Sequence, residues 1–170
     1  MIDETLVVSD TNIFFDLLSV DLLSNFFQLP CKIATTDFVI NEIIQPEQLK
    51  KIQAFIDSKK LDVAAFESDE VNIINEIHKN RDNNVSFTDC SVWYYAKEKN
   101  GRLLTGDGKL RKSAEEENVK VSGILYIFDN LLEYEILNKI SCAKKLEQLM
   151  QLNMRLPKSE CEKRIKRWRS

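Results

Sequence analysis

Short apolar runs alternate with helix-like patterns along the whole chain. Runs rich in apolar and β-branched residues, which are typical of buried strands, occur at residues 6–8, 32–35, 61–65, 102–105 and 120–122. Apolar residues recur at helical spacing in residues 13–29, 37–44, 46–58, 69–79, 88–99, 108–118, 124–137 and 138–154. Because helices separate successive strands, the pattern predicts an α/β fold, a parallel sheet with helices on both faces.

Composition fits this fold without changing it. The chain has 170 residues, of which 44% are hydrophobic and 30% charged, a balance that suits one globular domain with an appendage. Four glycines and three prolines give no sign of a long linker, and the sequence has no internal repeat. A net charge of −3 argues against a protein coated in basic residues, but an acidic metal site can coexist with local basic patches.

The cysteines and the single histidine restrict the chemistry. Cys31, Cys90, Cys142 and Cys161 follow neither a CxxC motif nor a metal clip, as expected in a reducing cytosol. With His78 as the only histidine, a zinc site or a histidine-based triad is nearly excluded. The N-terminal segment lacks a signal-peptide pattern, and no apolar run approaches the ~18 residues that cross a membrane. We therefore expect a cytoplasmic protein without membrane contacts.

Carboxylates are predicted to meet at one edge of the sheet. Asp10 directly follows the first expected strand, Asp107 follows the strand at residues 102–105, and Glu42 lies early in the helix after the second strand. Ligands of an open parallel sheet bind beyond the carboxyl ends of its strands, so connectivity places these three acids together. Asp89 joins them if its helix also starts at this edge.

The position of Asp89 adds chemistry to this pattern. At ~100° per residue, Asp89 shares a core-facing stripe with Val92, Trp93 and Ala96. An ionised carboxylate is rarely buried without a partner, and a divalent cation would supply one. Mg²⁺ favours carboxylate oxygens and lowers the pKa of a bound water, which suits phosphodiester hydrolysis without histidine. The pattern therefore favours a Mg²⁺ or Mn²⁺ site at this edge, where the residues themselves support the placement of Asp10, Asp89 and Asp107 best.

Each acid also has a purely structural interpretation. Asp10 and Asp107 could cap the helices that follow them. Ser86 and Asp89 have the N-cap to N3 spacing of a capping box. Glu42 could be a solvated residue on the polar side of its helix. The sequence leaves both interpretations open for each acid, and their shared location favours a common function.

Four segments resemble PIN-domain nucleases. They are residues 7–12 (VVSDTN), 36–43 (TDFVINEI), 87–91 (FTDCS) and 103–110 (LLTGDGKL). Each motif is short, but their order, spacing and position after strands make the match fairly specific over residues 6–132. The resemblance implies a three-layer α/β/α fold with a central parallel sheet. It implies a PIN-like nuclease domain in residues 1–135 and an added C-terminal helical appendage with a basic tail in residues 136–170.

The resemblance also implies an activity and partners. It points to metal-dependent hydrolysis of RNA that leaves a 5′-phosphate, with Asp10, Glu42, Asp89 and Asp107 as the catalytic acids. Small members of the family resemble VapC-type toxins, which are often dimeric and inhibited by an antitoxin peptide. We therefore expect an RNA substrate and, as further partners, an antitoxin protein and a second copy of the chain. The added C-terminal helix departs from the smallest toxins.

Residues beside the acids are candidates for supporting roles. We expect Thr11 or Asn12 to orient the first carboxylate or a metal-bound water, with helix-start chemistry as the alternative. Lys109, Arg111 and Lys112 could hold substrate phosphates or could be solvated surface charges. The tail after residue 157 carries six basic and two acidic residues, a net charge of four positive, and could contact RNA, pack as an arm or be solvated.

Two other functions compete with the ribonuclease. A PIN-like fold could act as a non-catalytic module that binds RNA or a protein partner, although all four acids are present. A phosphotransfer or phosphatase domain could use Asp10 as a nucleophile. However, Asn12 stands where such a domain would place its second Asp, so the acid/base partner is missing.

Overall fold

The computed structural model describes residues 2, 5–80 and 84–170. Its strands form one sheet in the order β3-β2-β1-β4-β5, and every pairing is parallel. The strands are β1 (Leu6–Ser9), β2 (Lys32–Thr36), β3 (Leu61–Ala64), β4 (Arg102–Leu104) and β5 (Val121–Ser122). The helices are α1 (Thr11–Ser19), α2 (Leu23–Phe26), α3 (Asp37–Glu42), α4 (Pro46–Asp57), α5 (Ser68–Lys79), α6 (Phe87–Glu98), α7 (Gly108–Glu116), α8 (Ile124–Glu133), α9 (Lys139–Leu152) and α10 (Lys158–Arg169). The predicted α/β fold with a parallel sheet is confirmed.

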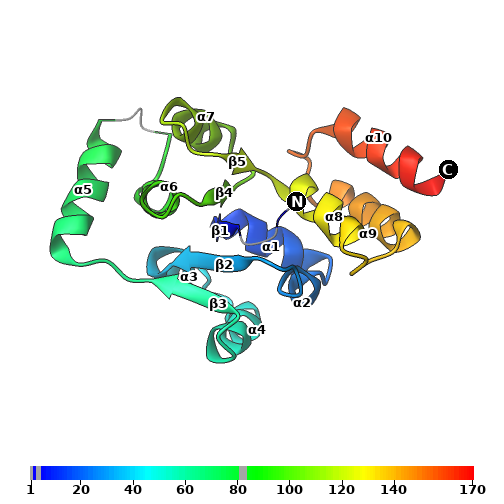
Figure 1. Cartoon of the computed structure of the whole chain (residues 1–170), viewed down its shortest axis with the longest axis horizontal. Helices are drawn as coiled ribbons and strands as arrows, with labels where there is room; N and C mark the ends of the chain where they lie inside the picture. The colour runs from blue at the N-terminus through cyan, green and yellow to red at the C-terminus, as the bar shows by residue number, and fades with distance from the viewer. Residues whose placement is uncertain (1, 3–4, 81–83) are drawn as a thin grey trace.

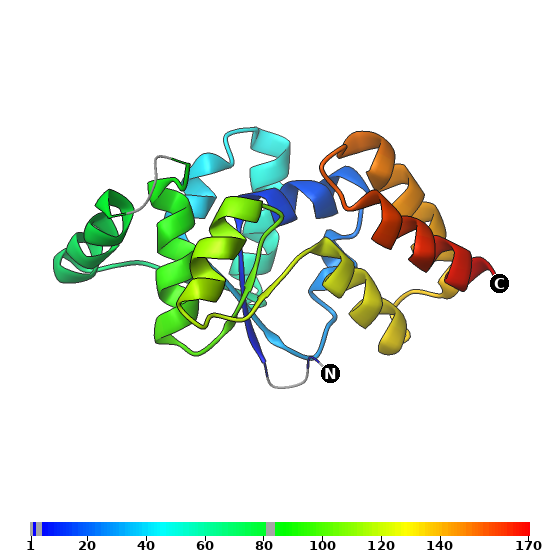
Figure 2. The same ribbon diagram turned by 90° about the horizontal axis from the view of Figure 1, so that it is seen from above.

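The strand order produces three layers. The chain moves outward from the central β1 to β3, then crosses back to add β4 and β5 on the other side of β1. Right-handed crossovers in the two directions place their helices on opposite faces of the sheet. Helix α6 contacts β1, β2 and β4, and it lies on one side of the sheet while α8 lies on the other (Figures 1 and 2). All strands end at a common carboxyl edge.

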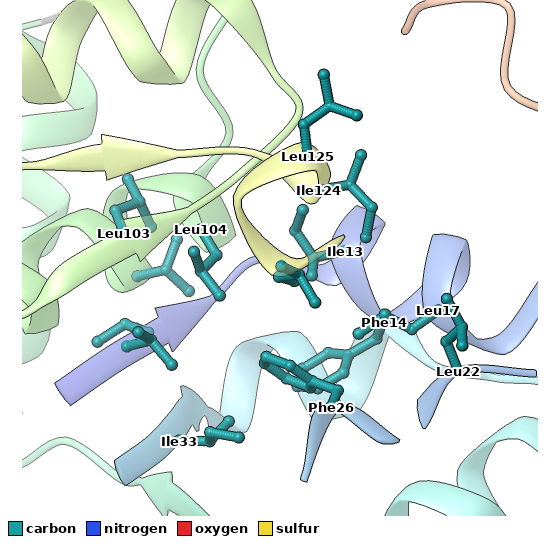
Figure 3. Close-up of a cluster of buried hydrophobic side chains, with 14 of the residues drawn as sticks. Ile13, Phe14, Leu17, Leu22, Phe26, Ile33, Leu103, Leu104, Ile124 and Leu125 are labelled. Carbon is teal, nitrogen blue, oxygen red and sulfur yellow. The ribbon is translucent and has the colours of Figure 1, made fainter. Parts of the chain in front are cut away.

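The apolar core on the α8 side joins α1 to the sheet. Ile13, Phe14 and Leu17 of α1 are fully buried. Ile13 lies near Leu104 of β4 and Ile124 of α8, while Phe14 lies beside Phe26 and Leu17 beside Leu22 (Figure 3). Removing such a side chain from water contributes roughly 1.5–3 kcal/mol. This core fixes α1 against the end of β4. It therefore also fixes the two turns that carry Asp10 and Asp107.

The predicted helix at residues 13–29 is two helices. Helix α1 ends at Ser19, and Asp21 adopts a φ of 54°, a left-handed conformation that a continuous helix cannot contain. Leu22 and Leu23 beyond this turn are still buried. The apolar pattern therefore runs through the turn, which explains why the sequence pattern suggested one helix.

The helix predicted at residues 37–44 is shorter than expected. Helix α3 ends at Glu42, and Ile44 is 87% exposed in the turn that leads to Pro46. A proline disfavours the helical conformation in the residue before it, so the chain is extended at Gln45. The expectation that Glu42 lies early in its helix was wrong, because it is the last helical residue.

The basic tail is a folded helix. Trp168 of α10 is 2% exposed and stacks on Phe128 of α8, with ring centroids 6.3 Å apart. The Arg164 guanidinium donates to Asp129 through Nε (2.9 Å) and Nη2 (2.8 Å). Helix α10 packs on α9, and the two lie at the end of the molecule opposite α5 (Figure 2). Within residues 5–80 and 84–170, no helix has the length and apolar character needed to cross a bilayer.

Candidate functional site at the carboxyl edge of the sheet

Buried polar side chains gather where β1, β2 and β4 end. Ser9, Asp10, Thr35, Thr36 and Thr105 are all at most 2% exposed. The Thr35 hydroxyl donates to the Ser9 carbonyl at 2.8 Å, which ties β2 to β1 beyond their shared ladder. Buried polar groups need hydrogen-bond partners, so this edge is an ordered polar network beside the apolar core.

Asp10 lies at the centre of this network. Its Oδ1 accepts from the Thr11 backbone N–H at 2.7 Å, and its Oδ2 accepts from the Thr105 hydroxyl at 2.8 Å. Burial, with the negative charge of Asp89 as the next largest cause, raises the pKa of Asp10 to about 7. The carboxyl group therefore exchanges its proton near neutral pH, although two donors hold it in place.

Thr105 connects Asp10 to the turn that carries Asp107. The Thr105 hydroxyl donates to Asp10 and accepts from the Asp107 backbone N–H at 3.0 Å. Asp107 is the N-cap of α7, and its Oδ1 accepts from the N–H groups of Lys109 (2.8 Å) and Leu110 (2.9 Å). The capping interpretation of Asp107 is thus confirmed, and one hydroxyl links the first acid to the last.

Asp89 forms the capping box that its spacing with Ser86 predicted. Its Oδ2 accepts from the Ser86 N–H, and its own N–H donates to the Ser86 hydroxyl, both at 3.0 Å. Burial raises the pKa of Asp89, and the charges of Asp107 and Glu42 raise it further. Asp89 is half-buried on α6. One of its oxygens caps the helix, and its carboxyl group is close enough to Asp107 and Glu42 for their charges to raise its pKa.

Glu42 reaches the site through Thr11. The Thr11 hydroxyl donates to Glu42 Oε2 at 2.7 Å, while the Thr11 N–H donates to Asp10. Thr11 therefore connects the carboxylate that follows β1 to the carboxylate at the end of α3. Its neighbour Asn12 lines a cavity beside the site instead.

The four carboxylates act on one another without converging on a point. Asp89 and Glu42 both raise the pKa of Asp10, so the charges acting on that buried carboxyl group are themselves carboxylates. Within the described residues, no three Asp, Glu, His or Cys side chains stand together so as to hold one metal ion. Asp89 and Asp107 instead cap their own helices.

The donor chemistry nevertheless suits a hard cation. The four acids supply only oxygen, the ligand that Mg²⁺ and Mn²⁺ prefer. Each oxygen of a carboxylate offers about two acceptor positions, so an oxygen that accepts one N–H or O–H keeps a further lone pair. The residues therefore fit a divalent ion by type and charge, and they would have to draw closer to bind it.

The basic residues of α7 lie in different surroundings. Lys109 and Lys112 are exposed, whereas Arg111 is half-buried and lines the same cavity as Asn12. Sequence reasoning missed Thr105 and Ser91, whose hydroxyl lies 2.9 Å from that of Thr36. A threonine directly between a strand and the Gly106 turn was the available signal for Thr105.

The fold is an open parallel α/β/α sheet with carboxylates near its carboxyl edge, the edge at which ligands of such sheets bind. A family model described as "DUF3368: PIN domain" matches residues 6–170. The chain therefore belongs to the PIN-domain family. No curated protein matches it.

The chain is similar to several solved structures at low sequence identity. PAE2754 from Pyrobaculum aerophilum is 16% identical, with a TM-score of 0.55 over 77% of this chain and 96% of that one. A domain of a functionally unknown protein from Methanocaldococcus jannaschii is 19% identical, with a TM-score of 0.48 over 70% and 90% of the two chains. VapBC2 from Rickettsia felis, bound to a DNA fragment from its promoter, is 14% identical, with a TM-score of 0.48 over 69% and 98%.

Proposed function

We propose that the protein is a metal-dependent endoribonuclease. In this proposal Asp10, Asp89 and Asp107 hold Mg²⁺ or Mn²⁺, and Glu42 completes the catalytic set. The observation that carries the proposal is the burial of Asp10 beside other carboxylates, whose charges raise its pKa. Such an arrangement is unfavourable for the ionised protein alone and favourable with a divalent cation. Membership of the PIN-domain family supports it.

The chain's own residues divide the work. Asp10 must give up its proton before it can act as a ligand, which a pKa of about 7 allows near neutral pH. Thr105 and Thr11 hold the carboxylates of Asp10 and Glu42 in position. Arg111, Lys109 and Lys112 of α7 would attract phosphates of the substrate. When bound, the ion would polarise a phosphoryl oxygen of the substrate and lower the pKa of a bound water.

RNA is the proposed substrate. An antitoxin protein and a second copy of the chain as partners rest on the sequence resemblance alone, as does the role of toxin. The ribonuclease proposal requires neither partner.

Cleavage of a fluorescent single-stranded RNA in Mn²⁺ tests the proposal. Asp10→Asn should lower the rate at least ~100-fold, because the loss of even an outer-shell partner of a metal costs up to that much. Asp21→Asn is the matched control, because it makes the same change at an exposed turn residue and should cleave like wild type. Equal cleavage by wild type and Asp10→Asn, with contaminating nuclease excluded, would refute the assignment.

Metal binding separates the enzyme from the non-catalytic module. Titration calorimetry of the wild-type protein should show Mn²⁺ binding, and Asp10→Asn should weaken it. A folded wild-type protein that binds no divalent ion at millimolar metal would favour the module.

A further inference from the structure

A cavity opens beside the acidic edge. Its volume is about 310 Å³, and it is bounded by α1, the β4–α7 turn, α7, the start of α8 and the segment that connects α9 to α10. Thr105, whose hydroxyl donates to Asp10, forms part of its wall. The cavity and the carboxylates thus share one residue, and a molecule bound in the cavity would lie next to the proposed reaction centre.

Part of the cavity wall is apolar. Ile13 of α1 and Ile124 of α8 approach each other from the two helices (Figure 3). Leu156 and Pro157 of the connection between α9 and α10 add further apolar surface to the wall. Binding sites for small molecules usually occupy roughly 300–1,000 Å³ and combine such apolar walls with a few polar groups. A volume at the lower limit suits a single flat ring system.

One polar group of the cavity wall is an oriented carboxylate, that of Asp16. Both oxygens of Asp16 accept from the Asn153 side-chain amide, at 3.1 and 3.2 Å. The Asn153 carbonyl oxygen in turn accepts from the Arg155 backbone N–H at 3.0 Å. Burial raises the pKa of Asp16, while the Asn153 bond and the charge of Arg155 lower it. Asp16 is therefore held by the C-terminal connection, and its remaining lone pairs can accept further N–H groups.

Two arginines supply positive charge at the same place. Arg111 lies against the turn at Gly123, where an added Cβ would be 3.5 Å from its Nη2 atom. Its hydrogen bonds to Val121 O (3.4 Å) and Glu115 Oε1 (3.5 Å) are long. Arg155 is exposed at the rim. Guanidinium groups placed in this way bind phosphate oxygens.

We propose that this cavity binds one unpaired nucleobase of the RNA substrate and that Asp16 selects a base with an exocyclic amino group over uracil. The inference rests on the proposed function and goes further, because it assigns a specificity residue. A base can enter the cavity only when it is unstacked, and such bases offer their hydrogen-bonding edges to side chains.

The preference follows from donors and acceptors. A carboxylate only accepts hydrogen bonds. Adenine, cytosine and guanine each carry an amino group that projects from the ring and can donate to Asp16. The single N–H on the pairing edge of uracil lies between two carbonyl oxygens, which a carboxylate repels. Arg111 and Arg155 would hold the adjoining phosphates whichever base is bound.

Binding of AMP, CMP, GMP and UMP to the full chain, without metal, tests this subsite. Amide NMR shifts should move in residues 123–125 and 153–156, and the three amino-bearing nucleotides should bind about tenfold more tightly than UMP, the worth of one charged hydrogen bond. Asp16→Asn should abolish the preference, because an amide can also donate to a uracil carbonyl. Arg155→Gln should weaken all four nucleotides alike, and Asp21→Asn should change nothing.

The outcomes keep the two proposals separate. Equal binding of all four nucleotides, shifts confined to other surfaces, no binding up to about 10 mM, or an unchanged preference in Asp16→Asn would overturn the subsite. Mononucleotide binding requires no cleavage. A protein that binds in the cavity but cuts no RNA would therefore lose only the ribonuclease proposal, and a ribonuclease without such binding would lose only the subsite.

Discussion

Asp10 combines two demands at the scale of a single residue. Its side chain caps α1 and lies 2% exposed among buried hydroxyl groups. Its pKa rises from 3.8 in an unfolded chain to about 7 in the folded one. The folded state therefore binds this proton more tightly. Below pH 3.8 this proton stabilises the folded state by up to about 4 kcal/mol. The contribution is lost as the pH rises through about 7.

Substitution of this residue should change how stability depends on pH. Without metal, Asp10→Asn should be more stable than wild type at pH 8, by about 1–3 kcal/mol, because no charge is buried. The difference should shrink toward pH 4. Urea unfolding at pH 4, 6 and 8 measures it, with Asp21→Asn as the control. A parallel pH profile for Asp10→Asn and wild type would contradict the raised pKa.

The sequence could predict residues such as Asp10 and Asp107 because strand ends fix their place in a parallel sheet. It could not predict that one hydroxyl, Thr105, joins them. That depends on side-chain rotamers and on the turn geometry at Gly106, which no spacing rule encodes. It also could not predict that the carboxylates stop short of converging, because helix capping competes for the oxygens of Asp89 and Asp107.

At the scale of elements, three of the four acids lie at helix N-termini, and Glu42 lies at the end of α3. Asp10 and Asp107 are N-caps, and Asp89 occupies the third position of α6. Capping and metal binding, which the sequence offered as alternatives, thus draw on the same side chains. The break between α1 and α2 at Asp21 escaped prediction because apolar residues keep helical spacing across the turn.

Loss of the α6 capping box should affect both folding and activity. Ser86→Ala should cost about 1 kcal/mol, the usual value of an N-cap, and should also lower RNA cleavage because Asp89 loses its anchor. Asn138→Ala removes the side chain that caps α9 and accepts from the Ser141 N–H at 2.8 Å. It should cost a similar amount without changing cleavage. Thermal unfolding measures the loss of stability in the two variants, and initial rates measure their RNA cleavage. Equal cleavage rates for Ser86→Ala and Asn138→Ala would show that the Ser86 anchor of Asp89 does not contribute to catalysis.

At the scale of the whole molecule, the C-terminal helices complete the structure around the site. Helix α10 is attached to α8 by Trp168 and by the paired contacts of Arg164 with Asp129. The connection between α9 and α10 lines the cavity beside Thr105. The basic tail could be identified from the sequence, but its apolar face was missed. Cys161, Ile165 and Trp168 have the i, i+4, i+7 spacing of one helix face, but the many charged residues around them concealed it.

Removing the Arg164–Asp129 contact should test how much it contributes to holding α10 on α8. Arg164→Met keeps the length of the side chain and removes its bidentate pair, which should cost about 1–2 kcal/mol for a partly buried contact. Amide hydrogen exchange should speed up within α10 and leave the central sheet unchanged. Lys163→Met, at an exposed neighbour, is the control. Unchanged exchange in α10 would show that apolar packing alone holds the helix.

The buried cysteines can report local opening of the folded protein. Cys90, Cys142 and Cys161 are fully buried in α6, α9 and α10, and Cys31 is half-buried before β2. Burial raises the pKa of Cys31 to about 12 and that of Cys142 to about 11. Alkylating reagents attack the thiolate, so they must wait until the surrounding element opens. The labelling rates of Cys90, Cys142 and Cys161 should therefore report the opening of α6, α9 and α10 in the unmodified protein.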